Sequence, residues 1–281
     1  MVGKILILLL ISLLLWNFII IIVNKRKYKK HFPIKIKIFN LGSSHAYFAY
    51  DYDERKKCVN LGDISQTLYY DNIMFDYIYD RIGKDAICFL TLSYFSFAGK
   101  ERWLKDDLVK YYRILKPKNF KGKEKVECFV CKYLPIIWSL KKKIKKRYLK
   151  SRELSKEERI KGHAKKLETS INKEYNIALI IDILEKCKAK KIKVIFITTP
   201  FTEYYNSFFS KKLLEKNFYG IILELSKKYN IRYFDFSHEY EIFNKKEYFD
   251  DYDHLSKEGS KVFMQELKKQ LKKEGIEIWL K

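Results

Sequence analysis

One serine and one acid–histidine pair stand near opposite ends of this 281-residue chain. Ser44 lies in the segment NLGSSH, which runs from Asn40 to His45 and follows an apolar stretch. Asp251 and His254 stand three residues apart near the C-terminus. A histidine can take the proton from a serine hydroxyl, and an aspartate can hold the imidazole in the tautomer that this transfer requires. If the fold brings them together, these residues predict nucleophilic acyl chemistry, with Ser44 as nucleophile and His254 as its base.

Each segment also has a purely structural interpretation. Gly-Ser-Ser after a strand is an ordinary helix N-cap, and so is an Asp-rich turn before a helix. His45 adjoins Ser44, but neighbouring residues at a helix start point about a hundred degrees apart, so we expect His45 to shape the pocket rather than act as the base. Asp253 stands next to His254 and is an alternative to Asp251 as the residue that orients the imidazole.

The segments that must position these residues alternate between strand and helix patterns. Short apolar runs predict strands at 34–41, 57–61, 86–92, 193–198 and 231–236. Apolar residues spaced by three and four predict helices at 65–82, 177–190, 211–229 and 259–273. This alternation predicts an α/β fold, a three-layer parallel sheet with helices on both faces. Ser44 then lies at the carboxyl edge of the sheet, where open α/β folds bind their ligands.

Together, the serine block and the Asp-x-x-His block resemble those of the SGNH/GDSL hydrolases, over roughly residues 38–281. The resemblance implies a flavodoxin-like arrangement of the sheet. It also implies that Ser44 is the nucleophile and that Asp251 completes the triad with His254. The glycine after the second predicted strand, Gly62, resembles the second block of the family. Its N–H then shares the oxyanion hole with the N–H of Ser44.

The third block departs from the family pattern. The family has Gly-x-Asn-Asp after the third strand, whereas this chain has LSYFSF at 92–97. Ser93 is the residue nearest the place of the missing asparagine, and we assign it the third oxyanion donor. Because losing one such donor costs about 3 kcal/mol of transition-state stabilisation, we expect slow or specialised acyl transfer rather than efficient general hydrolysis.

In detail, the two motifs resemble those of membrane-anchored SGNH-like proteins of teichoic-acid or polysaccharide acylation. That resemblance implies a serine esterase or acyltransferase, with an acylated glycan of the bacterial cell envelope, or another acyl ester, as substrate. The altered third block favours an alternative, a non-catalytic accessory protein of a membrane acyltransferase system. No cofactor is expected for either function.

The N-terminus predicts a membrane anchor. Residues Ile5 to Val23 are apolar except for Ser12 and Asn17, long enough to cross a hydrocarbon core, and no small-residue cleavage site follows them. We therefore divide the chain into an anchor (1–24), a linker (25–37) and an α/β domain (38–281), with an insertion at about 100–166. The basic residues after the helix favour a cytoplasmic domain by the positive-inside rule. Because the whole chain is rich in lysine, this flank carries less information than usual; we expect an extracytoplasmic domain, and the conflict stays open.

Most of the net charge of +24 lies in the insertion, where residues 100–166 hold 24 Lys or Arg against 8 Asp or Glu. Beside an anchor, such a segment indicates binding to anionic headgroups or surface polymers, or simply a solvated face, rather than nucleic-acid binding. Its run KKKIKKR, at 141–147, follows Trp138 as in membrane-surface helices. The lone pair Cys128 and Cys131 lacks further ligands, so we expect no metal site. The histidines outside the two motifs, His31, His163 and His238, receive no role.

Overall fold

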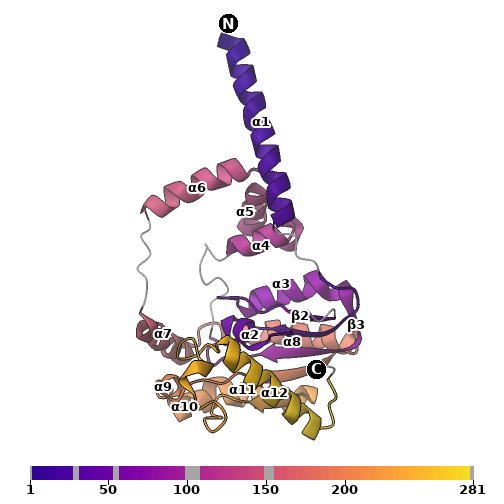
Figure 1. The fold of residues 1–281 in the computed structure, drawn as a ribbon, viewed down its shortest axis with the longest axis vertical. Coiled ribbons are helices and arrows are strands. Elements are labelled where there is room, and N and C mark those ends of the chain that lie inside the picture. Colours follow the sequence, from indigo (N-terminus) through magenta and orange to yellow (C-terminus); the bar gives the residue numbers. More distant parts are fainter. Residues whose placement is uncertain (1, 28–31, 53–56, 99–107, 149–154, 279–281) are drawn as a thin grey trace. The chain divides into compact units, whose positions relative to one another are not determined.

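A computed structural model describes residues 2–27, 32–52, 57–98, 108–148 and 155–278 of the chain (Figure 1). The strands are β1 (Ile36–Leu41), β2 (Cys58–Asn60), β3 (Ile82–Thr91), β4 (Lys193–Thr198) and β5 (Arg232–Asp235). The helices are α1 (Val2–Lys27), α2 (Ser44–Ala49), α3 (Leu68–Ile78), α4 (Leu108–Ile114), α5 (Gly122–Tyr133), α6 (Pro135–Tyr148), α7 (Lys156–Thr169), α8 (Lys173–Ala189), α9 (Glu203–Asn206), α10 (Lys211–Leu214), α11 (Gly220–Tyr229) and α12 (Lys257–Lys273).

The five strands form one parallel sheet in the order β2-β1-β3-β4-β5. They fall where the apolar runs predict them, which confirms the α/β fold. β3 begins at Ile82, earlier than predicted, because Ile82 pairs with Ile36 before the register shifts and Ile38 pairs with Ile87. The predicted helix at 211–229 is α10, a π-helical turn at Glu215–Tyr219 and α11 in succession.

Helices cover both faces of the sheet. Neighbouring residues in a strand point to opposite faces, and in β1 both Ile38 and Phe39 are buried. Ile38 belongs to a core cluster with residues of α2 and α12, such as Ala46 and Phe263. Phe39 stacks on Phe75 of α3, with ring centroids 5.8 Å apart, and α3 in turn packs on α8 (Figure 1). One layer therefore contains α2 and α12, and the other contains α3 and α8.

The chain forms two compact units. One comprises residues 32–103 and 154–281 and contains the sheet; its described part includes α7, from the end of the predicted insertion. The other comprises residues 1–31 and 104–153, with α1, α4, α5 and α6 in its described part.

The helix α1 is long and apolar enough to cross a membrane. Its apolar span from Lys4 to Arg26 has a mean hydropathy of 3.1 in its most apolar window, none of which is buried. Within the same unit, α5 and α6 contact the C-terminal half of α1.

Candidate functional site

Ser44 stands where β1 turns into α2, at the carboxyl edge of the sheet. Gly42 makes this turn possible: its φ is +137°, and a Cβ on it would lie 2.8 Å from the carbonyl oxygen of Thr91. Ser43 is the N-cap of α2 in an extended conformation, and Ser44 is the first helical residue. The hydroxyl of Ser44 is thereby presented at the edge where parallel sheets bind ligands.

The two motifs that define the predicted triad meet at this edge. His254 Nε2 lies 2.7 Å from Ser44 Oγ, and His254 Nδ1 lies 2.8 Å from Asp251 Oδ2. The other oxygen of Asp251 accepts the backbone N–H groups of Asp253, at 3.0 Å, and of His254, at 2.9 Å. Asp251 thus holds both the backbone of its own loop and the imidazole of His254. This arrangement suits transfer of the Ser44 hydroxyl proton to His254.

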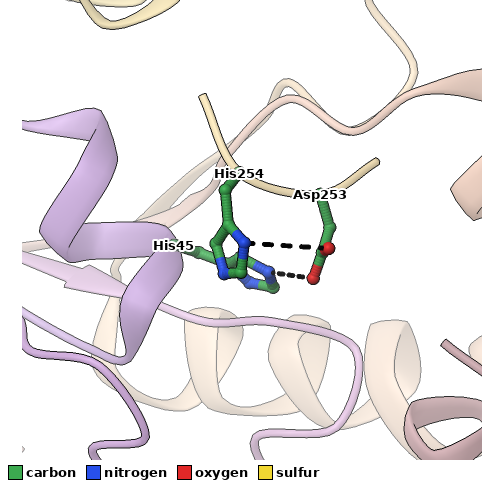
Figure 2. A group of neighbouring side chains, drawn as sticks. All are labelled: His45, Asp253 and His254. Carbon is green, nitrogen blue, oxygen red and sulfur yellow. Dashed lines mark hydrogen bonds and ion pairs between the residues drawn. The ribbon is translucent and has the colours of Figure 1, made fainter. Parts of the chain in front are cut away.

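Asp253 contacts a different histidine. Its fully buried carboxylate lies 2.9 Å from His45 Nε2, whereas His254 Nδ1 is 3.9 Å away (Figure 2). In this structure, therefore, Asp251 is the closer partner of His254, and Asp253 serves the second imidazole. Burial by itself would raise the pKa of Asp253, but its hydrogen bond with His45 and the neighbouring imidazoles lower it below the usual range.

His45 is enclosed rather than directed at Ser44. Burial lowers its pKa more strongly than Asp253 raises it, so the imidazole is neutral at pH 7. Because Asp253 is ionised, we assign the proton to Nε2, which leaves Nδ1 to accept the hydroxyl of Ser93 across 2.5 Å. The expectation that His45 shapes the pocket agrees with these contacts.

The three expected oxyanion donors differ in their partners. The N–H of Gly62 donates to Asn60 Oδ1 at 2.9 Å. The Ser93 hydroxyl donates to His45, and the Ser93 N–H donates to Ser96 Oγ at 2.8 Å. The N–H of Ser44, at the start of α2, has no intrahelical acceptor. In the resting arrangement, Gly62 and Ser93 would have to release these bonds before they could donate to an oxyanion.

Close packing holds Gly62 near the nucleophile turn. A Cβ at Gly62 would lie 2.8 Å from both the Ala46 Cβ and the Tyr47 backbone nitrogen. The side chain of Asn60 also donates to the carbonyl of Tyr47, at 3.1 Å, and so ties the end of β2 to α2. Only glycine fits at position 62 without displacing α2.

Arg159 of α7 also belongs to this site, although no sequence motif predicts it. Its Nη2 donates to Asp251 Oδ2 at 2.8 Å and to Asp253 Oδ1 at 2.6 Å. Its Nη1 lies 3.2 Å from His254 Nδ1, which must itself carry a proton in order to donate to Asp251. One guanidinium therefore contacts two carboxylates and shares an oxygen of Asp251 with the imidazole. No local motif marks this arginine among the basic residues of the insertion.

A second residue of α7, His163, also faces the site, although the sequence assigned it no role. Its Nδ1 lies 3.1 Å from the Tyr205 hydroxyl and 3.8 Å from Asp253 Oδ2, and its ring centroid lies 4.1 Å from that of Phe95, with the two rings tilted by 34°. Burial lowers its pKa well below the ordinary value, so His163 is neutral. His238 instead contacts the Ser237 hydroxyl, and His31 lies outside the described residues.

The cluster of His45, Asp253 and His254 brings three ligand-type atoms within 4.8 Å of one another. A divalent cation there would have to displace the Arg159 guanidinium, which already supplies positive charge 2.6 Å from Asp253. His254 is also engaged with Ser44 and Asp251. These residues fit an ion-pair network rather than a metal site.

Comparison with known proteins supports the resemblance for the second of the two motifs. A sequence model of the family described as DltD protein matches residues 141–269, which include Arg159 and the Asp251–His254 loop but not Ser44. No curated protein matches the chain.

Several solved structures are similar at low identity. A GDSL-like lipase from Bacteroides thetaiotaomicron is 12% identical with a TM-score of 0.43, over 84% of this chain and 88% of that one. A lipase/acylhydrolase from Enterococcus faecalis is 11% identical with a TM-score of 0.39, over 85% and 97%. A protein from Bacillus subtilis is 13% identical with a TM-score of 0.47, over 87% and 58%.

The buried carboxyl group of Asp71 supports the turn between β1 and α2 that carries Ser44. Asp71 of α3 accepts the N–H of Gly42 at 2.7 Å and the side-chain amide of Gln66 at 2.6 Å, both on Oδ1. Burial raises the pKa of Asp71 to about 7, against the opposing effect of these two donors. The folded protein therefore holds a proton on Asp71 that the unfolded chain releases near pH 4.

This raised pKa predicts a pH-dependent stability. The contribution of Asp71 is fully present below about pH 4 and is lost as the pH rises through about 7, because folding then requires a buried charge or a bound proton. Asp71→Asn keeps a neutral acceptor for Gly42 and should remove this contribution. We expect the melting temperature of the parent to fall more between pH 5 and pH 8 than that of the variant, in matched thermal scans. Equal pH dependence in the two proteins would contradict the raised pKa.

Proposed function

We propose that this chain, which resembles SGNH hydrolases and matches the DltD family over residues 141–269, is a serine esterase or O-acyltransferase for acyl esters of a bacterial envelope glycan. The observation that carries the proposal is the chain of contacts from Ser44 Oγ through His254 to Asp251, at 2.7 and 2.8 Å. The resemblance supplies the substrate class, since no described side chain by itself identifies a sugar.

The contacts support a two-step reaction. Ser44 Oγ attacks the acyl carbon while His254 Nε2 takes the hydroxyl proton, and Asp251 stabilises the imidazolium. The tetrahedral oxyanion is held by the N–H of Ser44, joined by that of Gly62 once it leaves Asn60. When the intermediate collapses, the alcohol leaves with the proton from His254. Water or a sugar hydroxyl then attacks the acyl-enzyme, giving its proton to His254, and Ser44 is regenerated.

A second candidate is a non-catalytic accessory protein of a membrane acyltransferase. The engaged donors favour it: the Gly62 N–H is bonded to Asn60, and Ser93, in place of the family asparagine, is bonded to His45. Under this alternative, the triad is a structural remnant and Ser44 does not react with acyl groups.

Covalent labelling separates the two candidates. We expect a fluorophosphonate to modify the full-length protein at Ser44, because the hydrogen bond to His254 activates that hydroxyl. Ser44→Ala should abolish labelling with little change in melting temperature, since a serine at a strand end buries little apolar surface. Ser43→Ala is the matched control and should still be labelled. A folded parent that stays unlabelled, or a label on another residue, would favour the accessory function.

Arg159 should act as a positioning residue for this chemistry. Its guanidinium holds Asp251, and Asp251 in turn orients the imidazole of His254. Arg159→Met removes the contacts to both carboxylates, so it should slow the labelling of Ser44. Arg159→Lys keeps the charge but loses the fork that reaches both carboxylates, so it should restore the labelling rate only in part. The measurement is the labelling rate of each variant at one pH, with circular dichroism as the folding check. A folded Arg159→Met variant that is labelled as fast as the parent would leave Arg159 with a structural role alone.

We further propose that α1 anchors the protein in the cell membrane, with the α/β unit on the extracytoplasmic side, where an envelope glycan is accessible. A cysteine placed at Lys269, which is exposed on α12, tests this orientation. Cys58 is changed to alanine in the same protein because it is partly exposed, whereas the other native cysteines are buried. A membrane-impermeant maleimide should label Lys269→Cys in intact cells and spare Lys4→Cys at the other end of α1. The reverse pattern would place the α/β unit in the cytoplasm, as the basic flank of α1 favours.

A further inference from the structure

The outward face of α5 is apolar. Glu124, Cys128 and Cys131, at helical spacing, form the buried face. On the opposite side, Val126 is 62% exposed and Phe129 is 49% exposed. A helix with one buried stripe normally turns polar side chains outward, so this outer face does not fit water.

The exposed apolar surface continues across the break into α6. Tyr133, whose ring lies 5.0 Å from that of Phe129, ends α5 and is itself exposed. Leu134 at the break and Ile137 and Leu140 in the first turns of α6 are also exposed. We call the six residues Val126, Phe129, Tyr133, Leu134, Ile137 and Leu140 the hairpin stripe. A continuous apolar patch of this kind marks an interaction surface.

Polar side chains border the hairpin stripe on one side. Lys141 Nζ lies 3.6 Å from Glu127 of α5 and 5.6 Å from the ring centroid of Trp138. A lysine at the edge of an apolar surface, where its ammonium group can reach water, is typical of the boundary between acyl chains and headgroups.

The hairpin lies against the apolar helix α1, within the same unit (Figure 1). Asn17 Nδ2 donates to the carbonyl of Tyr133 at 2.9 Å. Asn17 precedes Arg26 by nine residues, which is about 13 Å along a helix. If α1 crosses the membrane with Arg26 at the headgroups, the break between α5 and α6 therefore lies at the depth of the acyl chains.

Two backbone carbonyl groups at the break have partners within the protein. A helix end leaves carbonyl groups without intrahelical donors, and in hydrocarbon each of these must find a partner within the protein. The Tyr133 carbonyl accepts from Asn17, and the Leu134 carbonyl accepts the N–H of Trp138 at 3.0 Å. Pro135, at the first position of α6, has no N–H to satisfy. One of the two polar residues in the apolar run of α1 is thereby used at the break.

We infer that the hairpin stripe is embedded in the acyl chains of the leaflet next to α1, so that the protein holds the membrane by a helix and a half-inserted hairpin. The inference rests on the proposed anchoring by α1. Its occupant is lipid rather than a protein, because the stripe continues the exposed surface of α1. That surface is apolar around the helix, as at Phe18 (60% exposed) and Val23 (54% exposed), and does not form a single docking face.

Spin-label accessibility in the full-length protein tests this inference. Single cysteines replace Val126, Phe129 or Ile137 in the Cys58→Ala background, and the labelled proteins are placed in nanodiscs containing anionic lipid. Collisions with oxygen, which concentrates in acyl chains, are compared with collisions with a water-soluble nickel chelate. We expect all three sites to be accessible to oxygen and protected from nickel, as at Leu14→Cys on α1. Lys269→Cys on α12 is the aqueous control and should show the opposite ratio.

The other outcomes are equally specific. Nickel accessibility at the stripe, with Leu14→Cys still in lipid, would overturn the inference and leave the anchor intact. Protection from both reagents at the stripe would mean that protein covers it, which also overturns the inference. Nickel accessibility at Leu14→Cys would overturn the anchor and this inference together, whereas fluorophosphonate labelling of Ser44 would be unaffected.

Discussion

The ion pair between the Asp251–Asp253 loop and Arg159 is the constraint on which the rest of the site depends. The carboxylates of Asp251 and Asp253 repel each other unless a cation lies between them, and the burial of Asp253 removes the water that would otherwise screen its charge. A single guanidinium meets both at 2.8 and 2.6 Å. With the Arg159 guanidinium in contact with both carboxylates, each of them can also hold one imidazole: Asp251 holds that of His254, and Asp253 holds that of His45.

These separate contacts explain why the two acidic residues on either side of Tyr252 are not redundant. Asp251 faces the exposed side of the loop and takes part in the contact chain to Ser44. Asp253 is fully buried and connects through His45 to Ser93, at the end of β3. The loop after β5 is therefore fastened to the β1 and β3 ends of the sheet through separate imidazoles. The contact between His254 and Ser44 therefore relies on a second contact, the buried one between Asp253 and His45. No acyl group needs to touch this second contact.

Much of the fold was predictable from local patterns. Each strand is a short apolar run, and the parallel direction of the strands follows from the helices between the runs. The periodicity of apolar residues was therefore enough to predict where β1 to β5 lie in the sequence. The pairing of Ser44 with His254 and Asp251 was predictable only through the spacing of two motifs. The partners of Gly62 and Ser93 were not, because the bonds to Asn60 and His45 depend on side-chain packing between strand ends. Arg159 was hidden for another reason: in a basic segment, no spacing distinguishes the one arginine that tertiary structure places between two carboxylates.

The position of Arg159 also changes the interpretation of the insertion. A basic segment between two halves of a sheet looks like a surface addition, dispensable for the site. Yet α7, its last helix, belongs to the unit that contains the sheet and contributes both Arg159 and His163 to the carboxylate network. The DltD family match likewise begins within α6 and runs through α7 to the Asp251–His254 loop. The last helix of the insertion thus belongs to the charge balance of the site: without α7, Asp251 and the buried Asp253 would both lose the guanidinium that they share, and only their imidazole partners would remain.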